Sequence, residues 1–264
     1  MRKLRAIILG VKLLASLFLF KLRKETFKVS LASSILLHFA KAIKSDVSFS
    51  TTPEQQKRII SKFAKMSRLI NDALESENIS QEKLFKIVQN NSQEMHGGVG
   101  EITRSFSDIK SIVAKSPHLN EFLENVEKSW KANDLRNIKS NRSSEISHDN
   151  ILKATKESGG YFFLALTYLL NPKGLDEGMK EAIYNSGVWF QFLDDYRDRK
   201  EDISKKNTLF TETSDPHEEL LKKYVAESIT EIKKAIGEQH ALIRFMENLT
   251  MLVLLLDFAK LDWK

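Results

Sequence analysis

The chain contains no cysteine among its 264 residues. Disulfide frameworks and thiolate metal sites are therefore excluded, and the absence fits a reducing compartment, so we expect a cytoplasmic protein. The chain also lacks an uninterrupted apolar run of the about 20 residues that a membrane-crossing helix needs. Strand-like alternation, internal repeats and long low-complexity linkers are missing as well, and these absences together predict an all-α protein.

The composition is that of a globular protein with one large domain, since 42% of the residues are hydrophobic and 29% are charged. The formal net charge of +6 suits anionic partners such as diphosphates, an anionic membrane or nucleic acid. The basic residues are scattered through amphipathic segments and no nucleic-acid-binding module is recognisable. A nucleic-acid partner is therefore not expected.

Residues 1–24 form a separate segment, in which basic side chains surround the apolar stretch 6–20 and no acidic residue precedes Glu25. Lys12 interrupts the stretch, which makes it too short to cross a bilayer. It predicts either an amphipathic helix at a membrane interface, which would give peripheral membrane contact, or a helix that packs against the core. Residues 25–264 are predicted to form a single domain.

Apolar residues spaced three and four apart predict helices along the rest of the chain. The best-defined start is at Thr52, which can cap the helix, with Pro53 at the first helical position and Gln55 completing a capping box. This helix is predicted to reach about Glu75. The other helices are predicted over 25–44 and 242–261 and from Ser80, Glu101, Ser116, His148, Asp176 and Asp215. The polar stretch 133–150 is predicted to be a long loop.

The segment 190–202, with the sequence FQFLDDYRDRKED, changes abruptly from apolar to acidic and is the candidate active site. On a helix, Asp194, Asp198 and Asp202 share one face, and Phe190 lies upstream on it. The opposite face of the same helix is apolar too. The helix is therefore predicted to be buried in a larger bundle.

Stacked carboxylates on this helix need compensating cations, because like charges repel and burial increases the repulsion. Oxygen ligands of this kind favour a hard divalent ion, and Mg²⁺ is the predicted cofactor. The alternative is an ordinary solvated face, in which pairs such as Asp195 with Arg199 form salt bridges along the helix.

The same segment resembles the second aspartate-rich motif of polyprenyl diphosphate synthases, which reads F-Q-x-x-D-D-x-x-D followed by a further acid. The resemblance implies that Asp194, Asp195 and Asp198, with Asp202 as the further acid, bind Mg²⁺ that holds the diphosphate of the substrate. It also implies that Asp194 and Asp198 are catalytic.

A second acidic site is expected on a facing helix, because metals in a diphosphate-ionising enzyme bridge the substrate from both sides. The predicted metal ligands there are Asn71, Asp72 and Glu75, and Asp72 is also the predicted catalytic carboxylate. A helical wheel places Ser67, Arg68, Asn71 and Glu75 along one stripe of mostly small residues, as a cavity wall requires. Asp72 lies beside this stripe, where it can equally pair with Arg68.

Three elements resemble, in the same order, motifs of the tetraprenyl-β-curcumene synthase family, the large class I terpene synthases. Residues 72–75 (DALE) resemble its D-Y-L-D element, residues 96–99 (HGGV) its D-G-G-Y element, and residues 194–202 its D-Y-F-I-D-Q-x-E-D element. The resemblance implies the isoprenoid synthase fold, a helical bundle around a central apolar cavity. The arginine pair that follows the first motif of polyprenyl diphosphate synthases is absent, which favours a terpene synthase.

A further resemblance concerns the diphosphate. The segment 153–163 resembles the K-T-G-x-L-F element of polyprenyl diphosphate synthases, which implies that Lys156, or alternatively Lys153, contacts the diphosphate. The predicted diphosphate-binding residues are Arg68, Lys156, Arg197 and Lys205, and the predicted cavity lining is Phe162, Phe190, Gln191 and Ser67. The alternative for these positions is surface lysines and core aromatic side chains.

The sequence therefore predicts a Mg²⁺-dependent class I terpene synthase that ionises a prenyl diphosphate, releases pyrophosphate and excludes water from the allylic cation. Two alternatives stay open. A trans-polyprenyl diphosphate synthase would elongate the chain with isopentenyl diphosphate, whereas a non-catalytic relative would bind prenyl diphosphates or serve as a partner subunit. The oligomeric state, a homodimer included, is also open.

Overall fold

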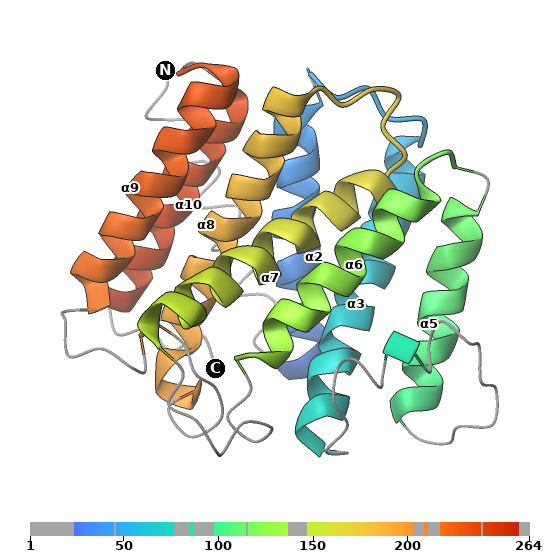
Figure 1. The fold of residues 1–264 in the computed structure, drawn as a ribbon, viewed down its shortest axis with the longest axis horizontal. Coiled ribbons are helices and arrows are strands. Elements are labelled where there is room, and N and C mark those ends of the chain that lie inside the picture. The colour runs from blue at the N-terminus through green and yellow to red at the C-terminus, as the bar shows by residue number, and fades with distance from the viewer. Residues whose placement is uncertain are drawn as a thin grey trace.

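The computed structural model describes residues 24–44, 46–76, 85–86, 98–114, 116–136, 147–202, 209–210, 217–238 and 240–258. Within these ranges the chain forms eight helices and no strand beyond an isolated bridge, so the all-α prediction is confirmed (Figure 1). The helices are α2 (Lys24–Ile43), α3 (Pro53–Ser76), α5 (Gly98–Val113), α6 (Leu119–Asp134), α7 (His148–Leu169), α8 (Glu177–Asp202), α9 (His217–Ile236) and α10 (Ala241–Phe258).

The predictions for residues 1–23 and for the helix starts at Ser80 and Asp215 lie outside the described residues. None of the described helices is both long and apolar enough to cross a membrane.

Short-range hydrogen bonds explain where α3 and α8 begin. The backbone N–H of Thr52 donates to Gln55 Oε1 at 2.8 Å, and the N–H of Gln55 donates to Thr52 Oγ1 at 3.3 Å. This is the predicted capping box, and it satisfies two amide groups that the first turn leaves unpaired. Before α8, Asp176 Oδ1 accepts a hydrogen bond from the N–H of Met179 at 2.7 Å. Both predicted starts are confirmed.

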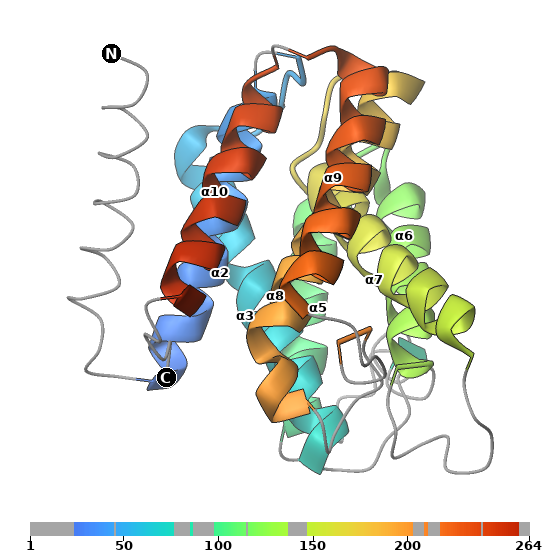
Figure 2. The ribbon, with the colours of Figure 1, turned by 90° about the vertical axis from the view of Figure 1, so that its left-hand side faces the viewer.

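The loops that precede α3 and α8 are joined to each other. The N–H of Ser50 donates to the carbonyl of Asn171 at 2.9 Å, and the N–H of Lys173 donates to the carbonyl of Ser48 at 2.7 Å. Asn171 has a φ of 56°, a left-handed conformation that asparagine adopts more readily than most residues. Since α3 and α8 start together and run in the same direction, both end at the same end of the bundle (Figures 1 and 2).

Helices α7 and α8 cross in backbone contact at two glycines. A Cβ on Gly159 would lie 2.9 Å from the carbonyl carbon of Gly187, and a Cβ on Gly187 would lie 3.0 Å from the Cα of Gly160. The ring of Tyr184 covers Gly160, and burial raises the pKa of Tyr184 well above its ordinary value. Only glycine permits this approach, which holds one face of α8 tightly against α7.

Helix α8 lies in the centre of the bundle, between α7 on one side and α9 and α10 on the other (Figures 1 and 2). Trp189 is fully buried, and its Nε1–H donates to Thr250 Oγ1 of α10 at 2.9 Å. Phe192 stacks on Tyr224 of α9, with ring centroids 4.8 Å apart. The prediction that this helix is buried in a larger bundle is therefore confirmed.

Candidate functional site

Side chains from α2, α3, α7 and α8 form an aromatic layer across the bundle, defined by Phe39, Phe63, Phe162, Phe163 and Phe190. Ring centroids are 4.8 Å apart for Phe63 and Phe162, 4.7 Å for Phe39 and Phe163, and 5.4 Å for Phe163 and Phe190. Phe162 and Phe190 stay partly accessible, while the other three are buried. The layer provides an apolar wall that continues from α3 to α8.

The two predicted acidic segments lie at the same depth of the bundle, beyond this aromatic layer. Counted from Pro53 and Glu177, where α3 and α8 begin, Asn71 and Asp194 lie about 27 Å and about 26 Å along the helix axes, at 1.5 Å per residue. Because the two helices start from joined loops and run in the same direction, their acidic segments come to one end of the bundle (Figure 2).

On the open side of α8, Asp194 and Asp198 share the guanidinium of Arg197. Arg197 Nη2 lies 2.7 Å from Asp194 Oδ1, while its Nε and Nη2 donate to the two oxygens of Asp198 at 2.8 and 2.9 Å. The exposed fractions of the three side chains are 37% for Asp194, 30% for Asp198 and 29% for Arg197. The two carboxylates therefore lie on one accessible face and already bind one cation between them.

Asp195 points to the other side of α8, where it is buried. Arg136, just after the end of α6, donates from Nη2 to Asp195 Oδ1, and Gln191 Nε2 donates to the same oxygen at 2.8 Å. The side chains of Arg136 and Asp195 are each only 3% exposed. Asp195 Oδ2 and Arg136 Nε have no hydrogen-bond partner among the described residues. The structure thus does not bring Asp195 together with Asp194 and Asp198.

This arrangement also shows the surroundings of Gln191 and Arg199. Gln191, a predicted cavity-lining residue, lies at the contact between α7 and α8, because the close approach of Gly159 covers that side of the helix. Arg199, the suggested alternative partner of Asp195, donates to the carbonyl of Tyr196 at 2.5 Å and lies over its ring at 3.9 Å from the centroid. The salt-bridged face is therefore built from Arg197.

The remaining predicted residues have different surroundings. Ser67 is half-buried and donates to the carbonyl of Phe63 at 2.9 Å, which places it one turn beyond the aromatic layer. Arg68 and Lys156 are half-buried, whereas Lys153 is exposed and lies 3.9 Å from Glu157. Phe162 and Phe190 belong to the aromatic layer. The side chains of Asn71, Asp72, Glu75 and Asp202, and Lys205 as a whole, lie outside the described part of the chain.

Arg136 is the residue that the sequence did not point to. It lies within the polar stretch 133–150, which was predicted to be a loop, and nothing in its local sequence separates it from a surface arginine. Its partner Asp195 is 59 residues away along the chain. Only the packing of α6 against α7, which brings Arg136 to Asp195 of α8, shows that it is buried.

The donor set on α8 fits Mg²⁺ in part. Among the described side chains, no group of three His, Asp or Glu residues is arranged to hold a metal ion. Asp194 and Asp198 nevertheless supply carboxylate oxygens on one accessible face and compensate a shared positive charge, which is the chemistry that a hard cation requires. Asp195 contributes no ligand to this face, since its side chain lies on the buried side of α8 and is only 3% exposed.

Comparison with known proteins assigns no family. No family model matches the chain, and no curated protein or solved structure is significantly similar to it.

Proposed function

We propose that this protein is a Mg²⁺-dependent class I terpene synthase, which ionises a prenyl diphosphate and releases pyrophosphate. The observation that supports this most is the parallel arrangement of α3 and α8, with the aromatic layer between them and the two acidic segments at equal depth beyond it. An amphiphilic substrate suits this arrangement, because its apolar chain can contact the aromatic layer while its diphosphate reaches the acidic end.

The residues of the site have separate tasks in this proposal. Asp194 and Asp198 would hold Mg²⁺, which supplies charge neutralisation for the departing diphosphate. Phe162 and Phe190 exclude water and turn aromatic surface toward the developing allylic cation. Arg197 is placed to exchange its carboxylate partners for diphosphate oxygens, since arginine binds both kinds of anion through paired N–H groups.

The first test is pyrophosphate release by the full chain with Mg²⁺, using allylic substrates from geranyl to heptaprenyl diphosphate, each with and without isopentenyl diphosphate. We expect release from at least one allylic substrate alone. Release that requires isopentenyl diphosphate would contradict a terpene synthase and support chain elongation.

A non-catalytic prenyl-diphosphate-binding protein is the second candidate. Two observations favour it: Asn71, a predicted metal ligand, offers no charge, and Arg197 already compensates Asp194 and Asp198. This candidate predicts saturable binding of a prenyl diphosphate, measured by titration calorimetry, with no release of pyrophosphate. Binding without release under every condition, from a protein with an intact helical spectrum, would replace the catalytic proposal.

A further inference from the structure

The proposed reaction makes no use of the buried ion pair between Arg136 and Asp195. Arg136 Nη2 donates to Asp195 Oδ1, whereas Arg136 Nε and Asp195 Oδ2 have no partner among the described residues. The pair therefore lacks the two parallel hydrogen bonds that make such contacts strong. Apolar side chains of similar volume often give equal or greater stability than a buried ion pair. The direction that this pair imposes on α8 explains it better than the stability that it adds.

Arg136 connects the pair of helices α6 and α7 to α8. It follows the end of α6, and α6 packs along α7, where Ser129 Oγ donates to the carbonyl of Ser158 at 2.8 Å. On α8, Gln191 Nε2 donates to Asp195 Oδ1 at 2.8 Å, the same oxygen that Arg136 bonds. Asp195 is thus held by one donor from its own helix and one from outside it, and hydrogen bonds restrict direction as well as distance.

The rotation of α8 about its own axis decides where its accessible carboxylates point. Asp194 and Asp198 are about 40° apart around the helix, and their mean direction is about 80° from that of Asp195. A carboxylate lies about 6 Å from the axis, so a rotation of about 10° moves it by about 1 Å. The groups of a binding site need to be held within about 0.5 Å. A restraint on Asp195 therefore restrains both accessible carboxylates.

This restraint acts at the level of the carboxylates along α8. Gly187, where α7 crosses α8 in backbone contact, lies about 11 Å along the axis before Asp194 and about 17 Å before Asp198. Asp195 directly follows Asp194 and precedes Asp198 by about 5 Å. The ion pair is thus closer to the accessible carboxylates than the glycine crossing is.

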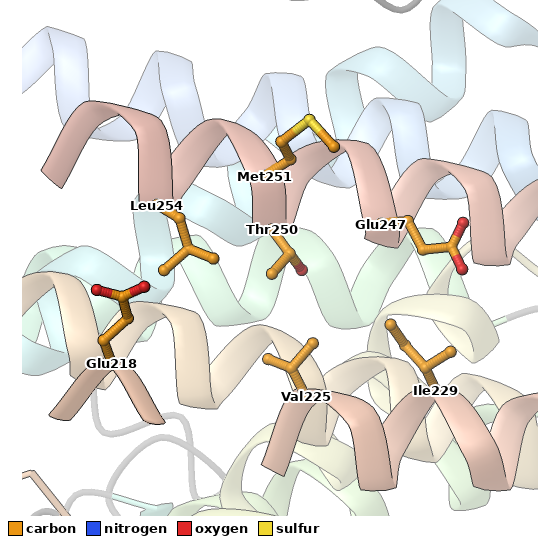
Figure 3. A pocket seen from close by; sticks show the side chains of 7 residues that line it. All are labelled: Glu218, Val225, Ile229, Glu247, Thr250, Met251 and Leu254. Atoms are coloured by element: carbon orange, nitrogen blue, oxygen red, sulfur yellow. The ribbon is translucent and has the colours of Figure 1, made fainter. Parts of the chain in front are cut away.

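The packing on the α9–α10 side of α8 is less continuous. An open groove of about 450 Å³ separates α9 from α10, with Val225 and Ile229 on one wall and Met251 and Leu254 on the other (Figure 3). Along this length the two helices do not support each other. The α6–α7 side therefore provides the firmer reference for the rotation of α8.

We propose that Arg136 is a positioning residue for the accessible carboxylates of α8. By holding Asp195, it keeps Asp194 and Asp198 together on the open face, where they would hold Mg²⁺. Arg136 itself contacts neither the metal nor the substrate. This inference rests on the proposed function, so the wild-type protein tests the function and the variants test the positioning.

The test measures binding of Mn²⁺, a paramagnetic substitute for Mg²⁺, by the full chain in the presence of inorganic pyrophosphate. Electron paramagnetic resonance, compared with a protein-free titration, gives an apparent Kd that needs no turnover. Arg136→Met combined with Asp195→Leu removes both buried charges and should stay folded. We expect its apparent Kd to rise at least about tenfold, because residues that orient metal ligands contribute about 10–100-fold to affinity.

Two further variants separate positioning from stability. Ile109→Ala on α5 is the stability control, because Ile109 is fully buried and α5 packs mainly against α3. Its urea midpoint should fall while its apparent Kd stays within about twofold of the wild-type value, since distant sites act independently. Gln191→Leu keeps the ion pair but removes one of the two hydrogen bonds to Asp195, so it should raise the apparent Kd by a smaller factor.

Three outcomes would overturn the positioning role. Wild-type affinity in the folded double variant would do so and leave the proposed function standing, and if the double variant does not fold, unchanged affinity in Gln191→Leu has the same meaning. An equal loss of affinity in Ile109→Ala would show that stability alone explains the effect. A wild-type protein that does not bind Mn²⁺ would remove the metal site from the proposed function, and the positioning role with it.

Discussion

In the C-terminal half of α8, aspartate side chains are accessible on one side of the helix and buried on the other. Asp194 and Asp195 are neighbours in the sequence, but their exposed fractions are 37% and 3%. Asp194 lies on the open side and shares Arg197 with Asp198, whereas Asp195 lies on the buried side and pairs with Arg136. A single acidic motif thus supplies both accessible carboxylates and a buried ion pair.

The difference between the two sides is energetic. An exposed ion pair is solvated and screened, so it contributes about 0–1 kcal/mol to stability. Removing one member of a buried pair costs about 3–5 kcal/mol, because the other charge is left without compensation. The buried side of α8 is therefore expected to control stability, whereas the ion pairs on the open side can be exchanged for others at little cost in stability.

The largest expected effect is on the buried side. Asp195→Ala should lower the free energy of unfolding by about 3–5 kcal/mol, because Arg136 would remain buried and unpaired. Urea unfolding followed by circular dichroism measures this loss. The double variant Asp195→Leu with Arg136→Met should recover most of it, since no buried charge remains. A loss below about 1 kcal/mol in Asp195→Ala would show that the pair is solvated.

The next effect is on the open side and concerns activity. Asp194→Asn and Asp198→Asn should each reduce pyrophosphate release at least about 100-fold, equivalent to about 2.7 kcal/mol, while changing stability by less than about 1 kcal/mol. Glu231→Gln on α9 is the matched control, because Glu231 also pairs with an exposed lysine, Lys234 at 2.6 Å. Unchanged release in both aspartate variants would remove the open side of α8 from the reaction.

The glycine crossing gives a third effect, again on the buried side. Gly187→Ala should cost about 1–3 kcal/mol, because the new Cβ would meet the backbone of Gly159 and Gly160 and force α7 and α8 apart. Gly174→Ala is the control, since a Cβ there meets nothing within 4 Å. Equal denaturation midpoints for the two variants would contradict the close contact.

The smallest effect concerns an exposed pair elsewhere in the bundle. Lys62 lies 2.6 Å from Asp108, and this hydrogen bond together with the lysine charge lowers the pKa of Asp108 below its ordinary value of 3.8. A carboxylate whose pKa is lower in the folded state stabilises the protein at pH values above its unfolded-state pKa. This stabilisation is lost as the pH falls through the folded-state pKa. Asp108→Asn should therefore cost less than about 1 kcal/mol at pH 7.

The pH dependence of this last variant gives its check. The difference between wild type and Asp108→Asn should disappear as the pH falls below 3.8 toward the lower folded-state pKa, and it should shrink in high salt. Urea unfolding at a series of pH values measures it. A difference that grows on acidification would have the wrong sign for this ion pair.

Much of the fold could be predicted because its signals are local. The capping box of Thr52 and Gln55 involves residues three apart, so it can be recognised before any tertiary contact is known. The apolar composition around Trp189 predicts that α8 is buried, since no face of the helix suits water.

The partners of the aspartates in α8 could not be predicted in the same way. A helical wheel separates Asp194 from Asp195 by about 100°, but it does not say which of them meets another helix. The wheel also does not say that Gln191 bonds Asp195 and meets Gly159 of α7. The approach of Gly159 to Gln191 depends on how α7 crosses α8, and Arg136 reaches Asp195 across 59 residues of sequence.

By itself, then, the sequence determined that the chain is helical, where helices such as α3 and α8 begin, and that an acidic segment follows the buried part of α8. These properties depend on periodicity and on hydrogen bonds within one turn. The tertiary structure alone decided which carboxylates stay accessible, because burial depends on how α7 packs against α8 and on how Arg136, after the end of α6, reaches Asp195. It also decided that Asn71 and Asp194 lie at equal depth, because the hydrogen bonds that align the starts of α3 and α8 join loops far apart in the sequence.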